Sequence, residues 1–500
     1  MSTLDDLRAQ WVNPGDVLSL LLLIGGDIVQ KAIAQLIGCE IHIPTRRHPG
    51  LSIAPVAFSF GWVAFGFSNL LSAIGERRLM PAAEYSSIVV NCSNGFARET
   101  RSWVLSRILR DHEMKFEVDS RSKEEGGRAE SLRVDIFTLG PAKGPTFDAL
   151  WWFGWITILA QICIAIIPWI FYGDWGVMIV ALCGNLIAAV TCALPQWKQE
   201  KWAGRKLDKD KVTCLTRGNG SLHVMVFIGS QGSWDLESLA AGTCVPRPET
   251  RWISLALATL WTCLLITVSG MKRHTWFLVG IGGIGMLQNV IVAGVSREPS
   301  AFGFHITRFA RAPTIIGIRR RYDDDGDAHV DVGEVINTLA DLNSWATEKP
   351  KKTARQPPPS DSIMPSWLSS MSRDDGVPEW LEAINPTVVE DASRKTVSSR
   401  FPFTKEKPSP TIYAIGVHGA LMELEKWVPT GGLAMIQVFF PTGLSYSDQS
   451  IRDNVHKKFW KRAYHTQNIR KRAEEKRRAE ERQRKTPTVD EEKGKETGPI

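Results

Sequence analysis

The feature that most constrains this chain is a series of long apolar segments spread over its first 300 residues. Each approaches the roughly 20 apolar residues that a helix needs to cross a lipid bilayer. Short turns join the segments in pairs, and longer polar inserts separate the pairs. We therefore expect an α-helical membrane protein with about six transmembrane helices. They form three hairpins, over residues 16–75, 148–197 and 252–295.

The clearest hairpin covers residues 150–197, where two apolar runs are joined only by Tyr172, Gly173, Asp174 and Trp175. A reversal this tight indicates two antiparallel helices. In the first hairpin, residues 51–75 are apolar and aromatic, and we expect them to span the bilayer. Polar residues interrupt the run at residues 17–38, which is compatible either with a span or with a helix lying in the interface.

Lysines and arginines near the ends of the runs indicate the orientation, because cytoplasmic loops carry an excess of them. On the side of the inserts and tail lie Arg77, Arg78, Lys198, Lys201, Arg297, Arg308 and Arg311, and on the other side Arg46, Arg47, Lys272 and Arg273. We therefore expect the inserts and the carboxyl-terminal tail in the cytosol, at the plasma membrane or an endomembrane. Acceptor patterns for N-glycosylation begin at Asn91 and Asn219, and modification of either would invert this orientation.

The two polar inserts, residues 76–147 and 198–251, contain strand and helix patterns. We expect strands near residues 87–92 and 132–139, a helix over residues 99–112, and a hairpin in which strands 212–216 and 222–228 flank Gly218, Asn219 and Gly220. Each insert is too small to build much core alone. We therefore expect both to pack together as one small α+β module.

The chain outside the hairpins divides by composition. Residues 1–15 lack the basic leader of a signal peptide, and residues 296–345 form a membrane-proximal segment. Residues 346–410 are rich in Pro, Ser and Lys, which predicts a disordered linker. Amphipathic helix is expected over residues 411–449, a basic helix over residues 450–486, and disorder over residues 487–500.

Polar side chains within the apolar runs are the main candidates for function. They are Asp27, Lys31, Gln35, Asn69, Gln161, Asn185, Gln288 and Asn289. Asp27 and Lys31 are four residues apart, so they share a helix face and can pair. Polar groups at membrane depth often mark the path of an ion or solute. Alternatively, Asp27 and Lys31 lie at headgroup level while the amides bridge helices.

The basic helix offers a second candidate. Residues 451–485 contain 14 Lys and Arg against 5 Asp and Glu. Lys457, Lys458, Lys461 and Arg462 could contact anionic lipid headgroups, each contributing about 1 kcal/mol. Interleaved acidic residues farther along fit a solvated helix equally well. Nucleic acid is the least favoured partner, because a membrane-tethered helix meets lipid first.

Two motif matches have simpler explanations. Gly280, Gly282 and Gly285 spell G-x-G-x-x-G, but inside an apolar run, where close helix packing explains them better than a dinucleotide site. Residues 323–334 resemble a calcium loop, yet Ala328 replaces the glycine at its sharp turn. We expect a solvated acidic loop there, with calcium binding as the alternative.

Nothing in the sequence supports catalysis. G-x-S-x-G, H-E-x-x-H and Walker patterns are missing, and the eight cysteines contain no C-x-x-C pair. We expect no enzyme, no cofactor and no metal site. We expect a non-enzymatic membrane scaffold whose cytosolic parts bind a protein partner, and the alternative is a transporter of a small solute or ion.

Several stretches resemble a family of uncharacterised multi-pass membrane proteins of filamentous fungi. They include APVAFSFGWVAFGF, RSWVLSRILRD, LTRGNGSLHVMV and HTWFLVGIGGIGMLQNVIVAG, in that order, with GALMELEKWVPTGGLAMIQVFF near the carboxyl end. The resemblance covers about residues 16–294. It implies a shared topology and a fungal setting, and it assigns no catalytic residue.

Overall fold

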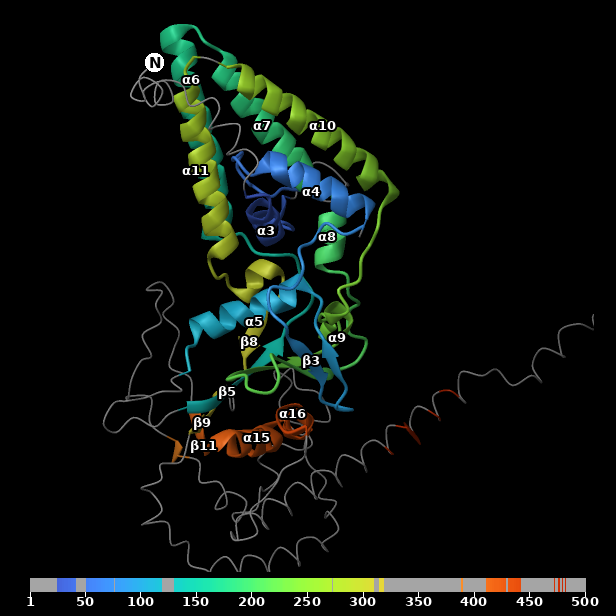
Figure 1. Cartoon of the computed structure of the whole chain (residues 1–500). Coiled ribbons are helices and arrows are strands. Elements are labelled where there is room, and N and C mark those ends of the chain that lie inside the picture. The colour runs from blue at the N-terminus through green and yellow to red at the C-terminus, as the bar shows by residue number, and fades with distance from the viewer. Residues whose placement is uncertain are drawn as a thin grey trace, which may run out of the picture.

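The computed structural model describes residues 25–41, 51–75, 77–118, 130–271, 273–309, 314–318, 388–389, 411–428 and 430–441, with five separate helical positions between 472 and 482. Helices gather at one end of the molecule and a β-sheet at the other (Figure 1). The long apolar segments build the helical end, and the polar segments between and after them build the sheet end.

Four helices run between the sheet and the far end of the molecule (Figure 1). They are α6 (Ala149–Tyr172), α7 (Gly176–Cys192), α10 (Pro248–Gly270) and α11 (Thr275–Gly294). By length and composition, α6, α10 and α11 could each cross a membrane. A fourth span results if α7 is counted with α8 (Pro195–Lys201), from which it is bent by 45°. The described residues therefore contain three or four candidate spans, in the second and third predicted hairpins.

The first predicted hairpin has a different structure. Residues 51–75 are not one long helix. β2 (Leu51–Ser52) pairs with β1 (Glu40–Ile41), residues 53–60 form neither helix nor strand, and α4 (Trp62–Ile74) has only 13 residues. Pro55 lacks an N–H group and disfavours helical geometry in the residue before it, so an apolar composition alone could not make this segment helical. The run at residues 17–38 is described from residue 25, and its helix α3 (Gly26–Leu36) has 11 residues.

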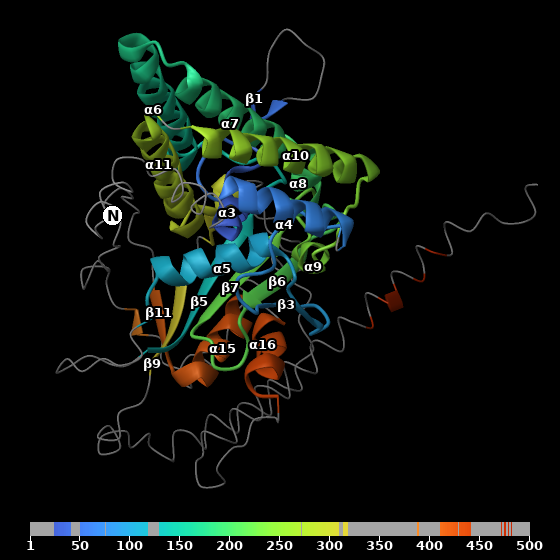
Figure 2. The same cartoon turned by 45° about the horizontal axis from the view of Figure 1, so that its top comes forward.

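The long helices lie in two pairs that diverge from the far end, α6 beside α11 and α7 beside α10 (Figure 1). α10 packs against α4 and α7, and α11 packs against α3 and α6. Figure 2 shows α3 and α4 lying between these helices and the sheet. The short helices of the first hairpin thus fill the space that the divergence opens.

The two tight turns meet at the far end. Nδ1 of His274 lies 3.1 Å from Oδ2 of Asp174, and the His274 ring stacks on Tyr172 at a centroid distance of 4.5 Å. These contacts join the α6–α7 turn to the α10–α11 turn.

The sheet combines strands from all three polar regions. In spatial order its strands are β10 (Val388–Val389), β11 (Thr411–Ile415), β9 (Thr314–Ile318), β5 (Glu130–Leu139), β7 (His223–Gly229), β6 (Lys211–Thr216), β3 (Ile88–Asn91) and β4 (Ala97–Glu99), while β8 (Ile306–Arg308) pairs with β5 off this path. β6 and β7 form the antiparallel hairpin expected around Asn219. Strands of the two inserts lie in one sheet, because β5 pairs with β7 and β3 pairs with β6.

Both faces of the sheet are buried. Alternate residues of the central strands, such as Phe137 and Phe227, belong to the core that continues into the helices. Their neighbours, such as Ile136 and Val226, pack against α15 (Gly416–Trp427) and α16 (Gly431–Phe439) on the opposite face. On the helical side, α5 (Trp103–Lys115) lies between sheet and bundle, beside α9 (Leu236–Ala240) (Figure 1).

The carboxyl-terminal part departs from the prediction of helix alone over residues 411–449. Its first five residues are strand β11, which pairs in parallel with β9. Thr411–Ile415 is rich in β-branched and aromatic residues, a composition that favours strand. The module therefore needs the segment after the last long helix as well as the two inserts.

Some predictions concern residues outside the described part. They include residues 1–15, the acidic loop at residues 323–334, the linker at residues 346–410 apart from β10, and residues 487–500. Within the predicted basic helix, only Arg472, Glu475, Lys476, Ala479 and Arg482 are described, as helical and exposed.

Candidate functional site

Residues 53–60, which we call the threaded segment, run without helix or strand inside the helical end. All but the first are buried. A chain without regular secondary structure has few local partners for its backbone N–H and C=O groups. Here the Val56 N–H group donates to the Ala54 carbonyl at 2.9 Å, and burying the other groups unpaired would cost free energy. Polar side chains from the surrounding helices must therefore supply these partners.

Amide side chains of α6, α7 and α11 bind this backbone. Oε1 of Gln288 accepts a hydrogen bond from the Ala57 N–H group at 3.2 Å, and Oδ1 of Asn185 accepts one from the Phe58 N–H group at 3.1 Å. Nε2 of Gln161 donates to the carbonyl of Phe58 at 2.7 Å. The backbone groups of two consecutive residues, Ala57 and Phe58, are thus paired by three different helices.

The amides also bind one another and the neighbouring residues. Nδ2 of Asn185 donates to Oε1 of Gln161 at 3.1 Å, which links α7 to α6. Asn289 donates to Oγ of Ser59 at 2.7 Å, and Gln288 to the carbonyl of Pro55 at 3.3 Å. The arrangement is a connected network, which orders each amide by more than one contact.

Glycines make room for the threaded segment. A Cβ atom added at Gly285 would lie 1.9 Å from the carbonyl oxygen of Phe58, and one at Gly282 would lie 2.2 Å from the Phe60 ring. Gly154 and Gly184 approach Pro55 and Phe58 in the same way. Close packing therefore explains Gly282 and Gly285, whereas Gly280 has nothing within 4 Å of an added Cβ.

The predicted transport candidates do not form one cluster. Asn185 and Asn289, with Gln161 and Gln288, surround the threaded segment. Asn69 donates instead to Oγ of Ser254 and joins α4 to α10. Gln35 donates to the carbonyl of Val295 at the sheet end of α11.

Asp27 and Lys31 do not pair, although they lie one turn apart on α3. Asp27 is exposed and Lys31 is half-buried, and neither makes an ion pair or side-chain hydrogen bond with another described residue.

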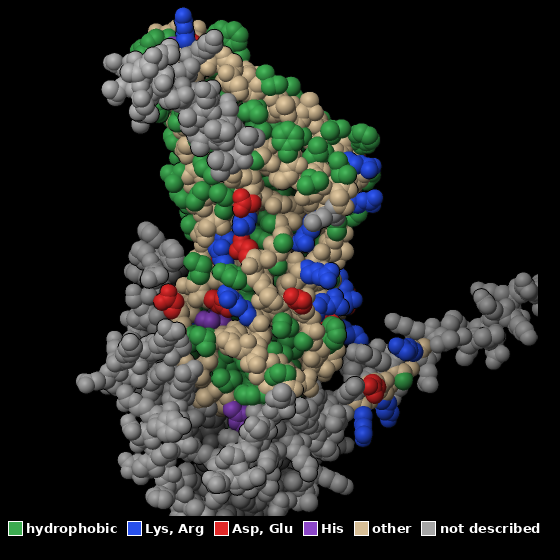
Figure 3. All heavy atoms as spheres, in the orientation of Figure 1, with side chains coloured by type: hydrophobic (Ala, Val, Ile, Leu, Met, Phe, Trp, Pro, Cys, Tyr) green, Lys and Arg blue, Asp and Glu red, His purple; other side chains and the backbone are tan. Residues whose placement is uncertain are grey.

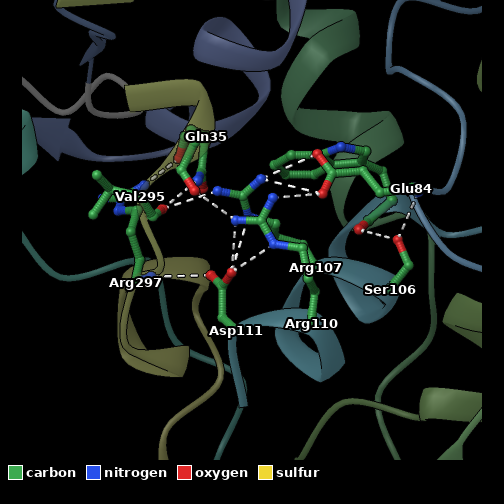
Figure 4. A network of polar contacts seen from close by, with 10 residues as sticks. Gln35, Glu84, Ser106, Arg107, Arg110, Asp111, Val295 and Arg297 are labelled. Carbon is green, nitrogen blue, oxygen red and sulfur yellow. Dashed lines mark hydrogen bonds and ion pairs between the residues drawn. The ribbon is translucent and has the colours of Figure 1, made fainter. Parts of the chain in front are cut away.

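Buried ionic contacts join α5 to the helical end (Figure 4). Arg107 is fully buried and pairs with Glu84 at 3.1 Å and Asp111 at 3.2 Å. Its guanidinium also donates to the carbonyl of Val295 at 2.9 Å, and Arg110 donates to that of Gly294 at 2.8 Å. The last carbonyls of α11, which have no partner within the helix, are therefore capped by cations of α5.

Arg297 extends this set of contacts to α3 and α6. Its side chain binds both carboxylate oxygens of Asp148, the residue that caps the first turn of α6, at 2.7 and 2.8 Å. It also donates to the carbonyl of Gln35, and its backbone N–H donates to Asp111 at 3.0 Å. We call the side chains of Glu84, Arg107, Arg110, Asp111, Asp148 and Arg297 the junction network.

A groove opens beside the junction network. It has a volume of about 630 Å³ and lies between α3, residues 81–85 and the last turns of α11. Lys31, Glu84 and Arg110 line it together with the apolar Ile28 and Val290. We call this the lateral groove.

A buried histidine cluster lies under α5 in the sheet module. Nε2 of His112 lies 2.9 Å from Oδ2 of Asp135. The same oxygen accepts a hydrogen bond from Arg133 at 2.7 Å, and Oδ1 of Asp135 accepts one from Thr314 at 2.7 Å. Burial alone raises the pKa of Asp135, but Arg133 and His112 more than offset it and hold the pKa well below its usual range. Burial, with the neighbouring His112, lowers the pKa of His223 to about 3.

Metal sites are not indicated within the described part, where no three His, Cys, Asp or Glu side chains group as ligands. Cys92 and Cys214 lie 3.3 Å apart between β3 and β6 as buried free thiols. The lipid-contact candidates Lys457, Lys458, Lys461 and Arg462 lie outside the described residues.

Two features of this region did not emerge from the sequence. The apolar composition of the threaded segment concealed it, although Pro55 within the segment and Gly61 directly after it are residues that favour a break in a helix. The junction network was hidden because its cations and carboxylates lie in different segments. Only the Arg107–Asp111 pair, spaced four residues apart on a predicted helix, could have been recognised.

No protein-family model matches this chain, and neither a curated protein nor a solved structure matches it.

Proposed function

We propose that this chain is a multi-pass integral membrane protein that acts as a non-enzymatic scaffold, holding its sheet module at the cytosolic surface to bind a protein partner. The main observation that supports this proposal is that the buried amide side chains of the helical end bind the backbone of the threaded segment. Side chains already bound to backbone are poorly suited to receive a solute.

The outward faces of the helices support the membrane placement. Large apolar side chains are exposed there, including Ile156, Leu159, Ile170, Leu186, Leu260, Ile266 and Leu287. Exposed tryptophans lie toward both ends, with Trp152 and Trp252 nearer the sheet and Trp169 and Trp276 nearer the turns. Trp152 and Trp169 are about 25 Å apart along the helix, close to the thickness of the hydrocarbon core.

The distribution of charge supports the orientation. Figure 3 shows charged side chains gathered between the apolar upper half of the molecule and the sheet. Basic residues flanking the helices at this end are Arg77, Arg78, Lys198, Arg247 and Arg251, whereas the described turns at the far end carry Arg273. An excess of basic residues marks the cytosolic side.

The junction network supports a scaffold rather than a flexible tether. Arg107 and Arg110 of α5 bind the end of α11. Arg297, whose backbone N–H donates to Asp111 of α5, binds the end of α3 and the first turn of α6. These contacts support a sheet module that is held to the helices in one orientation. A module fixed in this way presents the same surface to every partner.

The resemblance to fungal membrane proteins supports a multi-pass topology as part of the same proposal. In the tail, Lys457, Lys458, Lys461 and Arg462 are proposed to contact anionic lipid, which would bring the carboxyl-terminal region to the same membrane surface.

A small-solute or ion transporter is the second candidate, and the threaded segment is the observation that favours it. Non-helical backbone at membrane depth is tolerated where protein buries it or where it lines a cavity, and transporters use such breaks at their binding sites. In this alternative, Asp27, which has no described partner, is the charge that would accompany the solute.

One set of experiments separates the two candidates. The tagged full-length protein is purified from its own host in mild detergent, and proteins that come with it in stoichiometric amount are identified. The same preparation is placed in vesicles to measure the flux of Na⁺, K⁺ and H⁺.

A scaffold retains its partner when Asp27 is replaced by Asn and moves no ion faster than empty vesicles do. Flux that disappears in D27N, with the protein still folded, would establish the transporter instead.

A further inference from the structure

We propose that the lateral groove binds the headgroup of one anionic phospholipid, with Lys31 as the principal contact to its phosphate. This inference rests on the membrane placement proposed above, and it assigns a ligand to a site different from the basic tail.

The groove lies where a headgroup would be. Gly294, which lines it, is the last residue of α11, and the opposite wall is formed by residues 81–85 at the start of the sheet module. The groove therefore spans the boundary between the apolar helices and the charged level that Figure 3 shows above the sheet.

The charges of the lining leave one cation uncompensated. Glu84 is neutralised by Arg107 and Arg110, at 3.1 and 3.0 Å. Arg110 also contacts Asp111 at 3.0 Å. Lys31 has no ion pair or hydrogen bond with a described residue, so its ammonium group is available to a phosphate.

The remaining lining is apolar and continues outward. Ile28, Val290 and Ala293 form the wall on the helical side. Val290 is 45% exposed, and Leu287, about one turn earlier in α11 and farther from the groove, is 59% exposed. An acyl chain attached to a headgroup at Lys31 would lie along this surface, whereas a free phosphate ion would leave it uncovered.

The size of the groove fits a single lipid headgroup with part of its glycerol. At about 630 Å³ it lies within the range of roughly 300–1,000 Å³ typical of small-molecule sites. Charge at one wall and apolar surface at the other match an amphipathic ligand better than a soluble one.

The test measures lipid binding to the purified full-length protein in an uncharged detergent. The probes are dioctanoyl phosphatidylglycerol, which carries a net negative charge, and dioctanoyl phosphatidylcholine, which has the same acyl chains and no net charge. A ligand that binds the folded state raises the unfolding temperature with its concentration, which yields an apparent Kd. We expect the anionic lipid to bind more tightly by about fivefold or more, the effect of one basic residue near an anionic headgroup.

Two variants with matched controls locate the site. Lys31→Gln removes the free cation and should weaken binding of the anionic lipid by about fivefold, while Lys143→Gln, an exposed lysine that does not line the groove, should leave it unchanged. Gly294→Leu adds an apolar side chain at a residue that lines the groove and whose added Cβ would meet nothing within 4 Å, so it should narrow the groove and weaken binding of the anionic lipid. Gly280→Leu introduces the same side chain on α11 away from the groove and should have no effect on binding.

Three results would overturn the proposal: equal affinity for both lipids, affinity unchanged by both groove variants, or an equal rise in unfolding temperature with sodium phosphate. If Lys31→Gln lowers the unfolding temperature without lipid, Gly294→Leu and the comparison of the two lipids decide the question. Recovery of the protein in the supernatant after sedimentation without detergent is a separate result, which would remove the membrane placement itself.

Discussion

Gln161 connects three groups of the helical end that lie in three different elements. Its Nε2 binds the carbonyls of Phe58 and Ile281, and its Oε1 accepts from Asn185. Each buried group that loses its partner costs about 1–3 kcal/mol.

We therefore expect Gln161→Leu to lower the free energy of unfolding by at least about 2 kcal/mol, seen as a lower unfolding temperature in detergent. Cys163→Leu, an exposed position on the same helix, is the control and should change it little. A Gln161→Leu protein as stable as the wild type would show that the threaded segment does not depend on this amide.

His223 makes the stability of the module sensitive to acid. Its pKa is about 3 in the folded protein, whereas an unfolded histidine binds a proton near pH 6.5. Between these values the unfolded chain binds more protons, so folding weakens as the pH falls. From pH 7 to pH 5 the loss from this residue is about 2 kcal/mol.

His223→Phe should reduce the difference between the unfolding temperatures measured at pH 7 and pH 5. If the variant and the wild type lose stability in parallel over this interval, another group is responsible.

At the scale of elements, the fit between α11 and the threaded segment can be tested with one methyl group. Gly285→Ala would place a Cβ 1.9 Å from the carbonyl oxygen of Phe58, so the two elements must move apart. Gly283, two residues earlier on the same helix, has nothing within 4 Å.

We expect Gly285→Ala to lower the yield of monodisperse protein on size-exclusion chromatography and its unfolding temperature. Gly283→Ala should be neutral or more stable by up to about 1 kcal/mol, because alanine favours helix. The same behaviour in both variants would mean that the packing of Phe58 against α11 is not tight.

The buried guanidinium group of Arg107 joins α5 to the helical end. Arg107→Met leaves the carboxylates of Glu84 and Asp111 with one partner fewer, which costs about 3–5 kcal/mol when a buried pair is broken. Lys115→Met on the same helix breaks a surface pair with Glu298, worth less than about 1 kcal/mol.

Thermal unfolding of both variants in detergent should show a large effect for Arg107→Met and a small one for Lys115→Met. Equal effects would mean that the junction network holds the module no more strongly than an exposed pair does.

The elements that could be predicted from the sequence are those indicated by a few adjacent residues. The turn at residues 173–175 and the Asn-Gly hairpin between β6 and β7 each depend on a few adjacent residues. The threaded segment could not be derived in this way, because Phe58 pairs with amides 103 and 127 residues away. The sequence shows Asn185 as a polar residue in an apolar run. It does not show that Asn185 binds the backbone of Phe58, because the two residues are far apart in the chain.

At the scale of the whole molecule, the described polar elements lie at one end and the turns of the long helices at the other (Figure 1). The proposed orientation is tested with a membrane-impermeant maleimide on sealed vesicles whose cytosolic face points outward. Asn219 lies in the exposed β6–β7 turn, and Trp175 is 62% exposed at the far end.

Asn219→Cys should be labelled in intact vesicles above the background of the native cysteines, and Trp175→Cys only after detergent is added. Labelling in the reverse order, or a glycan on Asn219 of the wild-type protein, would place the module on the opposite side.

The threaded segment also constrains the order of biosynthesis. Residues 53–60 leave the ribosome long before the helices that hold them: the amides of Gln161, Asn185 and Gln288 follow 103, 127 and 231 residues after their partners in the segment. During that interval the nascent chain has no internal way to shield these peptide groups. Their final placement must therefore wait until α11 is complete, although the segment itself is synthesised 231 residues before Gln288.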